Sequence, residues 1–228
     1  MWQLDNRTPF AADRAWVRGR DGTEIWLVAV KASFTLRADG EVKVADEQPP
    51  VTQAPVHLGK PGQSSLLYDT DLPRTKLTTD IVLNGCAHAP RGEPVTRLDV
   101  GLAVGPVVKM LRVHGDRCWH GRSISAPTPF IAMPLVYERA YGGRDVRAGT
   151  PDAPSFDARN PVGTGWSAAA DHLDGVRLPN IEYPDAPIES WTDRPAPAGF
   201  GPIACHWQPR AALAGTYDER WQQTRLPL

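Results

Sequence analysis

Residues Thr96–Val113 read TRLDVGLAVGPVVKMLRV and give the clearest indication of the fold. From Leu98 to Val104, large apolar residues alternate with polar or small ones. This is the period-2 pattern of a strand that turns one face toward a core. Gly105–Pro106 then turns the chain, and Val107–Val113 returns as the partner strand. The stretch predicts an antiparallel β-hairpin.

The N-terminal half contains further strand signals. Glu24–Phe34 (EIWLVAVKASF) is an apolar run rich in β-branched and aromatic residues, which predicts a central strand buried on both faces. Asp39–Gly40 is typical of a hairpin turn that leads into a short strand at Glu41–Ala45. Asp80–Ala87 (DIVLNGCA) predicts another strand, in which Gly85 indicates a bulge or a close backbone approach.

The C-terminal half is dominated by proline. The chain has 23 prolines in 228 residues, about twice the usual ~5%, so long uninterrupted helices are excluded there. Ser167–Gly175 predicts a short helix with a serine N-cap, and Thr216–Glu219 forms a capping box for a second one. Asn160 and Asn180 are predicted to form turns.

Together these patterns predict a mainly β protein. We expect a single antiparallel β-sandwich or barrel-like domain over residues 1–228, with long Pro/Gly-rich ordered loops and a few short helices.

Composition excludes several functional classes. The formal net charge is −1 and no basic cluster stands out, so nothing favours nucleic-acid binding. Asp5 and Arg7 interrupt the N-terminus where a signal peptide needs an apolar core, and no apolar run approaches the ~20 residues of a membrane helix. The chain has three cysteines, Cys86, Cys118 and Cys205, an odd number that favours reduced thiols. We therefore expect a cytoplasmic protein without membrane insertion.

Four phrases combine glycine or proline with aromatic residues, which makes rigid, irregular backbone. None of them matches a catalytic signature. They are MPLVYERAYGG (Met133–Gly143), NPVGTGW (Asn160–Trp166), LPNIEYP (Leu178–Pro184) and PAGFGPI (Pro197–Ile203).

These phrases also carry a resemblance that spans about Asn6 to Leu226. The chain resembles a bacterial family, long labelled only as of unknown function, whose members are encoded beside type VI secretion genes. The motifs that carry the resemblance, in order, are TPF (Thr8–Phe10), VKASF (Val30–Phe34), EQPPV (Glu47–Val51), MPLVYERAYGG, NPVGTG, LPN, PAGFGPI and AGTYDERW (Ala214–Trp221).

The resemblance implies a non-enzymatic adaptor or chaperone. Such a protein binds the PAAR-like domain or the N-terminal region of a type VI effector and helps to load that effector onto the VgrG spike. The family usually continues with an acidic-aromatic segment beyond the point that corresponds to Leu228. The resemblance therefore also implies that this chain is truncated or short at its C-terminus.

Arg139 has two interpretations. An arginine between Tyr137 and Tyr141 has the composition of an interface hot spot. Alternatively, Arg139 pairs with Glu138 or caps loop carbonyls in a partly buried setting. The apolar flanks and Gly142–Gly143 favour the second interpretation, because they indicate tight packing.

Six of the eight tryptophans fall into two groups. Trp26, Trp119 and Trp207 are predicted to be core residues. Those among polar or loop residues, Trp2, Trp166 and Trp191, are predicted to be exposed anchors. The predicted partner-binding set is Trp2, Tyr137, Arg139, Tyr141, Trp166 and Trp191.

Metal and catalytic sites are not predicted. On strands, the pairs Cys86/His88 and Cys118/His120 would each share a face, and two such pairs could form a Cys2His2 zinc site. Cys205–His206 is a third neighbouring pair. However, the knuckle spacing of structural zinc motifs is missing, and buried cysteine is commonly a small apolar residue. We therefore expect no metal and no cofactor.

Two other classes of function remain as alternatives. His114, Asp116 and His120 could supply acid–base chemistry for a hydrolase with a His/Asp/Cys pocket, although His114–Arg117 is also typical of a turn. Tryptophan on loops over a β-sandwich would also suit a carbohydrate-binding module. That function would require carboxylates or amides beside each ring, which the sequence does not plainly provide.

Overall fold

The computed structural model describes residues 3–19, 21–73, 78–150 and 153–213 of the chain. The described chain is mainly β and divides into two compact units. Unit 1 comprises Met1–Val56, Tyr68–Asp80 and Gly215–Leu228, and unit 2 comprises His57–Leu67 and Ile81–Ala214. The single domain expected over residues 1–228 stays a prediction.

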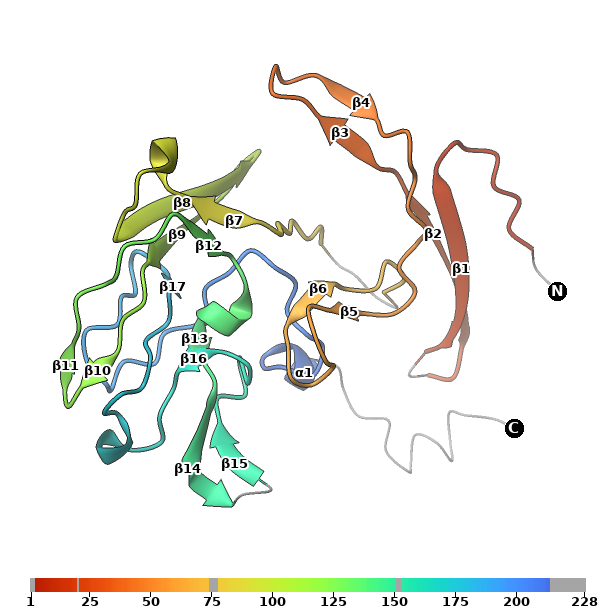
Figure 1. The fold of residues 1–228 in the computed structure, drawn as a ribbon. Coiled ribbons are helices and arrows are strands. Elements are labelled where there is room, and N and C mark those ends of the chain that lie inside the picture. Colours follow the sequence, from red (N-terminus) through yellow and green to blue (C-terminus); the bar gives the residue numbers. More distant parts are fainter. Residues whose placement is uncertain (1–2, 20, 74–77, 151–152, 214–228) are drawn as a thin grey trace. The chain divides into compact units, whose positions relative to one another are not determined.

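Unit 1 contains two β-hairpins (Figure 1). Strand β1 (Ala11–Arg18) pairs with β2 (Glu24–Lys31), and the short strands β3 (Phe34–Leu36) and β4 (Val42–Val44) pair across the predicted turn at Asp39–Gly40. The hairpin signal of the sequence is confirmed.

The strand predicted at Glu24–Phe34 is confirmed over Glu24–Lys31, but its predicted central position with both faces buried is wrong. Strand β2 has β1 as its only partner within the described chain, so Val28 and Val30 are exposed. The apolar run breaks after Lys31 because Ser33 is held by the side chain of Gln48. That side chain accepts a hydrogen bond from the Ser33 backbone N–H at 2.8 Å and donates one to its carbonyl at 3.0 Å.

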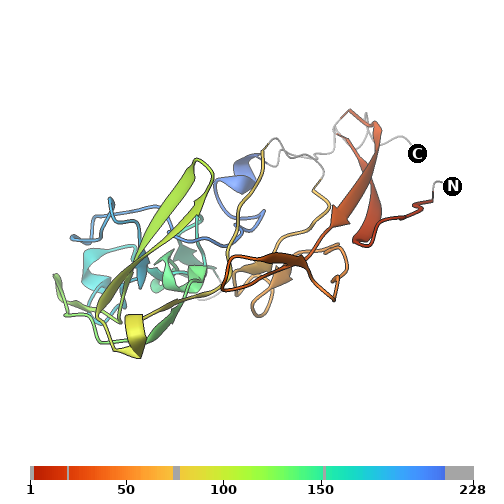
Figure 2. The same ribbon diagram turned by 90° about the horizontal axis from the view of Figure 1, so that it is seen from above.

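Unit 2 is built on the predicted hairpin. Strands β8 (Arg97–Val104) and β9 (Val107–His114) pair with Val104 opposite Val107, and β17 (Ile181–Glu182) adds to the other edge of β9. The hairpin prediction is therefore confirmed. Figure 2 shows the same hairpin from above.

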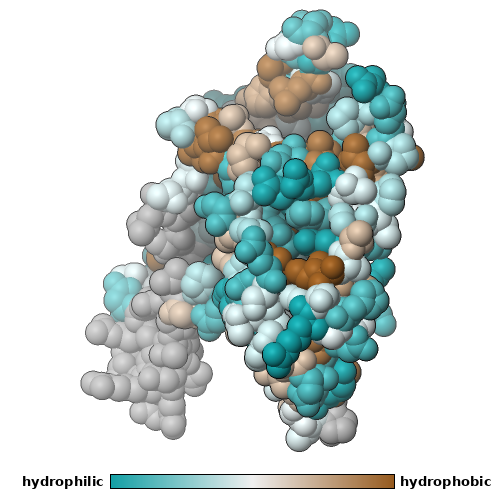
Figure 3. Space-filling view, turned by 90° about the vertical axis from the view of Figure 1, so that its left-hand side faces the viewer, coloured by the Kyte–Doolittle hydropathy of each residue, from teal (hydrophilic) through white to brown (hydrophobic). Residues whose placement is uncertain are grey.

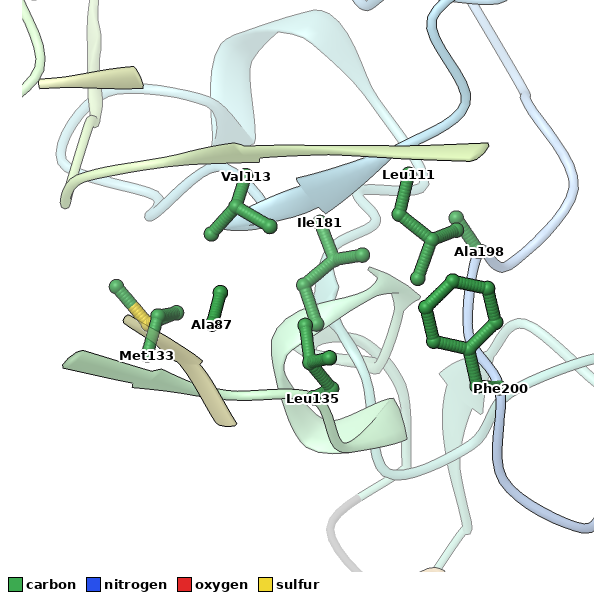
Figure 4. Packing of buried hydrophobic residues seen from close by; sticks show 8 residues of the cluster. All are labelled: Ala87, Leu111, Val113, Met133, Leu135, Ile181, Ala198 and Phe200. Carbon is green, nitrogen blue, oxygen red and sulfur yellow. The ribbon is translucent and has the colours of Figure 1, made fainter. Parts of the chain in front are cut away.

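A two-stranded sheet lies below the three-stranded sheet formed by β8, β9 and β17 (Figure 4). Strands β7 (Cys86–His88) and β12 (Ala132–Pro134) pair antiparallel. The strand predicted at Asp80–Ala87 therefore begins only at Cys86, after Gly85. The buried side chains between the two layers are Ala87, Leu111, Val113, Met133, Leu135, Ile181, Ala198 and Phe200. Burial of this apolar surface is the main stabilising contribution here.

The other strands form two-stranded pairs. They are β5 (Val56–His57) with β6 (Leu66–Tyr68), β10 (Trp119–His120) with β11 (Ser123–Ile124), β13 (Tyr141–Gly142) with β16 (Thr164–Gly165) and β14 (Arg144–Thr150) with β15 (Ala153–Phe156). All sheets are antiparallel except the β13–β16 pair, and no sheet of the described residues closes into a barrel. The barrel-like alternative is thus not found.

Helices are few and short. Single 3₁₀ turns lie at Pro90–Gly92, Tyr137–Arg139 and Ala170–His172, and α1 spans Arg210–Leu213. The helix predicted at Ser167–Gly175 is only the third of these turns. Its serine does not cap it, because the Ser167 hydroxyl bonds to Asp145 and to the Ala169 carbonyl. The predicted capping box at Thr216–Glu219 lies outside the described residues. None of the helices described could cross a membrane.

Candidate functional site

The Gly/Pro phrases of unit 2 meet around the 3₁₀ turn Tyr137–Arg139. Asn160, from the phrase NPVGTGW, is fully buried against this turn. Its amide donates hydrogen bonds to the carbonyls of Tyr137 at 2.7 Å and Tyr141 at 3.0 Å. Asn160 is therefore a buried tie between two phrases, where the sequence predicted a turn former.

Gly142 and Gly143 allow this close approach. Both have positive φ, +142° and +105°. A Cβ at Gly142 would lie 2.3 Å from the carbonyl oxygen of Asn160, and one at Gly143 would lie 2.4 Å from that of Gly163. Only glycine fits such positions. The tight packing expected from this dipeptide is confirmed.

Glu138 and Arg139 do not pair with each other. The Glu138 carboxylate accepts hydrogen bonds from the backbone N–H and the hydroxyl of Ser65, at 2.7 and 2.8 Å. Arg139 turns instead to Asn180, where its Nη1 donates to Oδ1 at 2.9 Å, and to Asp116, with 3.7 Å between Nη1 and Oδ1. The Arg139 side chain is 37% exposed, so the partly buried setting is confirmed with different partners.

Arg139 borders a polar pocket with a volume of about 220 Å³. The pocket collects residues from three of the phrases and from the turn after β9. Its lining residues are Asp116, Arg117, Glu138, Arg139, Thr164, Arg177, Leu178 and Asn180. Three arginines and two carboxylates thus surround a space that could hold a small polar group.

Asn180 holds the pocket together. Its amide nitrogen donates to the His114 carbonyl at 3.1 Å and to Asp116 Oδ1 at 3.0 Å, while its Oδ1 accepts from Arg139. Its backbone N–H donates to the Arg139 carbonyl at 2.8 Å. A predicted turn former is therefore the residue that fixes Arg139 and Asp116 relative to each other.

Behind the pocket lies a buried ion pair. Arg117, only 8% exposed, donates through Nη2 to Glu182 Oε1 at 2.5 Å and to the Pro179 carbonyl at 2.9 Å. Burial raises the pKa of Glu182, and the Arg117 charge opposes that rise. The Arg117 Nε is buried without a hydrogen-bond partner among the residues described.

His114 lies beside this pair, with 3.6 Å between its Nε2 and Glu182 Oε2. Burial, and then the positive charges of Arg117 and Arg112, lower the pKa of His114 to about 4. The imidazole is therefore neutral at physiological pH. Asp116 lies in the pocket, whereas His120 lies on β10 beside Cys118, so the three residues considered for acid–base catalysis do not form one group.

The predicted partner-binding residues occupy different settings. Tyr137 and Tyr141 are core residues, 5% and 2% exposed, and Trp166 and Trp191 are half-buried against the cluster that contains Tyr141. The latter two are thus not the freely exposed anchors that the sequence suggested. Trp2 lies outside the described residues. The predicted core positions of Trp119 and Trp207 are confirmed, whereas Trp26 is half-buried.

None of the cysteine–histidine pairs is among the described residues that line the polar pocket, although Cys118 forms an isolated β-bridge with the lining residue Arg177. Cys118 Sγ lies 3.6 Å from His120 Nε2, and Cys86 and His88 are both exposed on β7. Within the part of the chain that the structure describes, no group of three or more His, Cys, Asp or Glu residues could hold a metal ion.

A second candidate surface belongs to unit 1. On β3–β4, the cross-strand pairs Phe34/Val44 and Leu36/Val42 are exposed, with Leu36 reaching 78%. On β1–β2, Trp16, Val28 and Val30 are exposed on one face. We call these two groups the apolar hairpin faces. By contrast, the side of unit 2 that carries β10 and β11 is mainly hydrophilic, with small separate apolar patches (Figure 3).

Unit 2 also has an apolar pocket of about 250 Å³, which Tyr137 and Leu135 line together with Leu66. It lies on the Tyr137 side of the 3₁₀ turn, and the polar pocket lies on the Glu138–Arg139 side. Sequence reasoning missed both pockets, because each is lined by segments far apart in the chain. The available signal was the cluster of Gly/Pro phrases, whose loops supply several of the lining residues.

Comparison with known proteins identifies a family. A family model described as an uncharacterized protein conserved in bacteria, DUF2169, matches residues 21–228. The chain therefore belongs to this bacterial family. No curated protein and no solved structure matches it.

Proposed function

We propose that this member of the family is a non-enzymatic adaptor of type VI secretion. It binds the PAAR-like domain or the N-terminal region of an effector and helps to load that effector onto VgrG in the cytoplasm. The observation that carries the proposal is the pair of apolar hairpin faces in unit 1. The resemblance of the sequence motifs supplies the identity of the partner.

The apolar hairpin faces support binding to a protein on energetic grounds. A two-stranded hairpin is marginally stable by itself in water, and contiguous exposed apolar surface typically marks an interaction site. Leu36 and Val42 lie directly opposite each other and are both exposed. A partner that covers them would bury apolar area worth about 25 cal/mol per Å² before the costs of association.

We also infer a small sandwich in unit 2. The three-stranded sheet β8–β9–β17 and the β7–β12 pair contribute to one buried cluster. Two such layers around a core are the basis of a sandwich architecture, and they would give the loops around Arg139 a rigid support.

The two alternatives have less support. A carbohydrate-binding module would present several exposed tryptophan rings, but Trp166 and Trp191 pack against a core cluster, and Trp16 alone is exposed among the described tryptophans. A hydrolase would need its Cys, His and Asp in one pocket, but Cys118 and His120 are not among the described residues that line the pocket with Asp116.

Co-purification with the effector encoded beside the gene tests the proposal. The parent protein should retain the effector, a PAAR-like protein or VgrG. The double variant Leu36→Ser/Val42→Ser should lose it, because both changes remove apolar surface without touching a core. Val146→Ser, at an exposed valine of β14, is the matched control and should bind like the parent. If the parent captures none of these proteins, the adaptor proposal fails.

A further inference from the structure

The polar pocket of unit 2 contains guanidinium groups whose donors are largely unused. A guanidinium offers five N–H donors. In the described part of the chain, Arg139 makes one side-chain hydrogen bond, to Asn180, and Arg177 makes one, to Asp116. Arg117 donates hydrogen bonds only from its Nη2, to Glu182 and to the Pro179 carbonyl. Its Nε is buried without a partner.

The two carboxylates that line the pocket do not satisfy these donors. Glu138 is fully engaged by Ser65, at 2.7 and 2.8 Å. Asp116 lies 3.7 Å from Arg139 and 3.3 Å from Arg177. Strong charge-assisted hydrogen bonds are about 2.7–2.9 Å long, so the contacts of Asp116 with the two arginines are weak, and its carboxylate is held instead by the Asn180 amide at 3.0 Å.

The floor of the pocket is buried and its rim is exposed to solvent. Arg117 and Glu182 are both buried and bonded at 2.5 Å. The side chains of Arg139 and Arg177 are much more exposed, and they can adjust toward a group that enters from solvent. Asn180 keeps the base of this rim in place through its bonds to Arg139 and Asp116.

We propose that this pocket binds a carboxylate carried by a protein segment, which Arg139 and Arg177 hold in place of Asp116. A guanidinium matches a planar carboxylate with two parallel N–H···O bonds. A volume of about 220 Å³ accommodates one such group with its neighbouring atoms. The carboxylate comes from an acidic side chain or from a C-terminus. That its carrier is a secretion partner rests on the proposed function.

Nucleic-acid phosphate is the weaker fit to the same arginines. The net charge of the chain is −1, whereas binding driven by phosphates needs an extended basic surface.

Titration of the full chain with small probes, followed by NMR of the arginine Nε–H signals, tests this inference. N-acetylglutamic acid α-amide carries only a side-chain carboxylate, N-acetylglycylglycine only a terminal one, and N-acetylglycylglycine amide none. Saturable shifts at Arg139 and Arg177 are expected with at least one acid and not with the amide. The acid that binds more tightly identifies the source of the carboxylate.

Three variants sharpen the test. Arg177→Gln should lower the affinity for the acid at least tenfold. Arg91→Gln, at an exposed arginine that pairs with Glu93, should leave the affinity for the acid unchanged. Asp116→Asn should tighten binding by about threefold or more, because it removes a competing charge.

Equal shifts with the amide, tighter binding of inorganic phosphate than of both acids, or weaker binding by Asp116→Asn would overturn the carboxylate site. The titration contains no effector. Its failure therefore leaves the adaptor proposal to be decided by co-purification, and failure of co-purification leaves the carboxylate site intact.

Discussion

Arg139 and Asn180 are joined twice. The Arg139 Nη1 donates to Asn180 Oδ1 at 2.9 Å, and the Asn180 backbone N–H donates to the Arg139 carbonyl at 2.8 Å. One contact links side chains and the other links backbones, so the 3₁₀ turn at Tyr137–Arg139 and the loop before β17 are fixed to each other. Because the side-chain contact lies at the rim of the polar pocket, its loss should affect stability and the pocket together.

Replacement of Arg139 by alanine tests the side-chain half of this link. The change should lower the free energy of unfolding by about 1–2 kcal/mol, since it removes a hydrogen bond to a charged group at a partly exposed site. The buried Arg117–Glu182 pair stays intact, so the protein should still fold. Chemical denaturation monitored by tryptophan fluorescence measures the loss. Arg91→Ala is the control, and an unchanged midpoint for Arg139→Ala would show that the contact contributes nothing to stability.

Asn160→Ala should be more damaging. It removes the Asn160 donor from the Tyr141 carbonyl and leaves the Tyr137 carbonyl with the Ala140 N–H. A buried acceptor without its donor and a second lost hydrogen bond together cost about 2–4 kcal/mol. Thermal melting followed by circular dichroism should show a clear decrease in Tm. Asn84→Ala, which removes a single hydrogen bond at an exposed position, is the comparison. Equal effects of the two substitutions would contradict the buried tie.

Gly142→Ala should prevent folding of unit 2. Its φ of +142° disfavours any side chain, and the added Cβ would lie 2.3 Å from a backbone oxygen that cannot move easily. Gly175 also has positive φ, +77°, but a Cβ there meets nothing within 4 Å. Gly175→Ala should therefore cost only about 1 kcal/mol. Soluble yield and circular dichroism distinguish the two outcomes, and a well-folded Gly142→Ala protein would refute the close approach.

His114 should make stability depend on pH. Its pKa falls from an ordinary value near 6.5 to about 4 in the folded protein because of burial and neighbouring arginines. Between these two values the unfolded chain binds the proton and the folded one does not. The free energy of unfolding therefore keeps its full value with respect to His114 above pH 6.5. It decreases by about 2–3 kcal/mol as pH falls toward 4.

Denaturation midpoints measured at intervals from pH 7 to pH 4 check this expectation. His114→Gln should flatten the curve over that range, because glutamine does not titrate. His88→Gln, at an exposed histidine of β7, should leave the curve unchanged. A parent curve that is already flat between pH 4 and 6.5 would contradict the assignment to His114.

Local pattern predicted part of this fold. The hairpin around Gly105–Pro106 and the turn at Asp39–Gly40 follow from period-2 alternation and turn chemistry, which act over a few residues. The Glu24–Phe34 run was misjudged because apolar composition does not show whether a strand has neighbours. Within the described chain, strand β2 has one neighbouring strand, and Val28 and Val30 remain exposed.

The candidate site was predicted only in outline. The sequence marked Arg139 and its tight glycine surroundings, and both are found in the structure. It could not show that Glu138 bonds to Ser65, 73 residues away, or that Asn180 connects Arg139 to Asp116. Such long-range partners depend on how the loops pack, and a single sequence contains no local signal for that.

The wide separation of the pocket residues has a consequence during synthesis. Asp116 and Arg177 are 61 residues apart and Ser65 and Glu138 are 73 apart, so no growing chain can complete the pocket before Asn180 leaves the ribosome. Until then, Arg139 lacks the residue that orients it. A nascent chain therefore cannot form the proposed carboxylate site until Asn180 has left the ribosome.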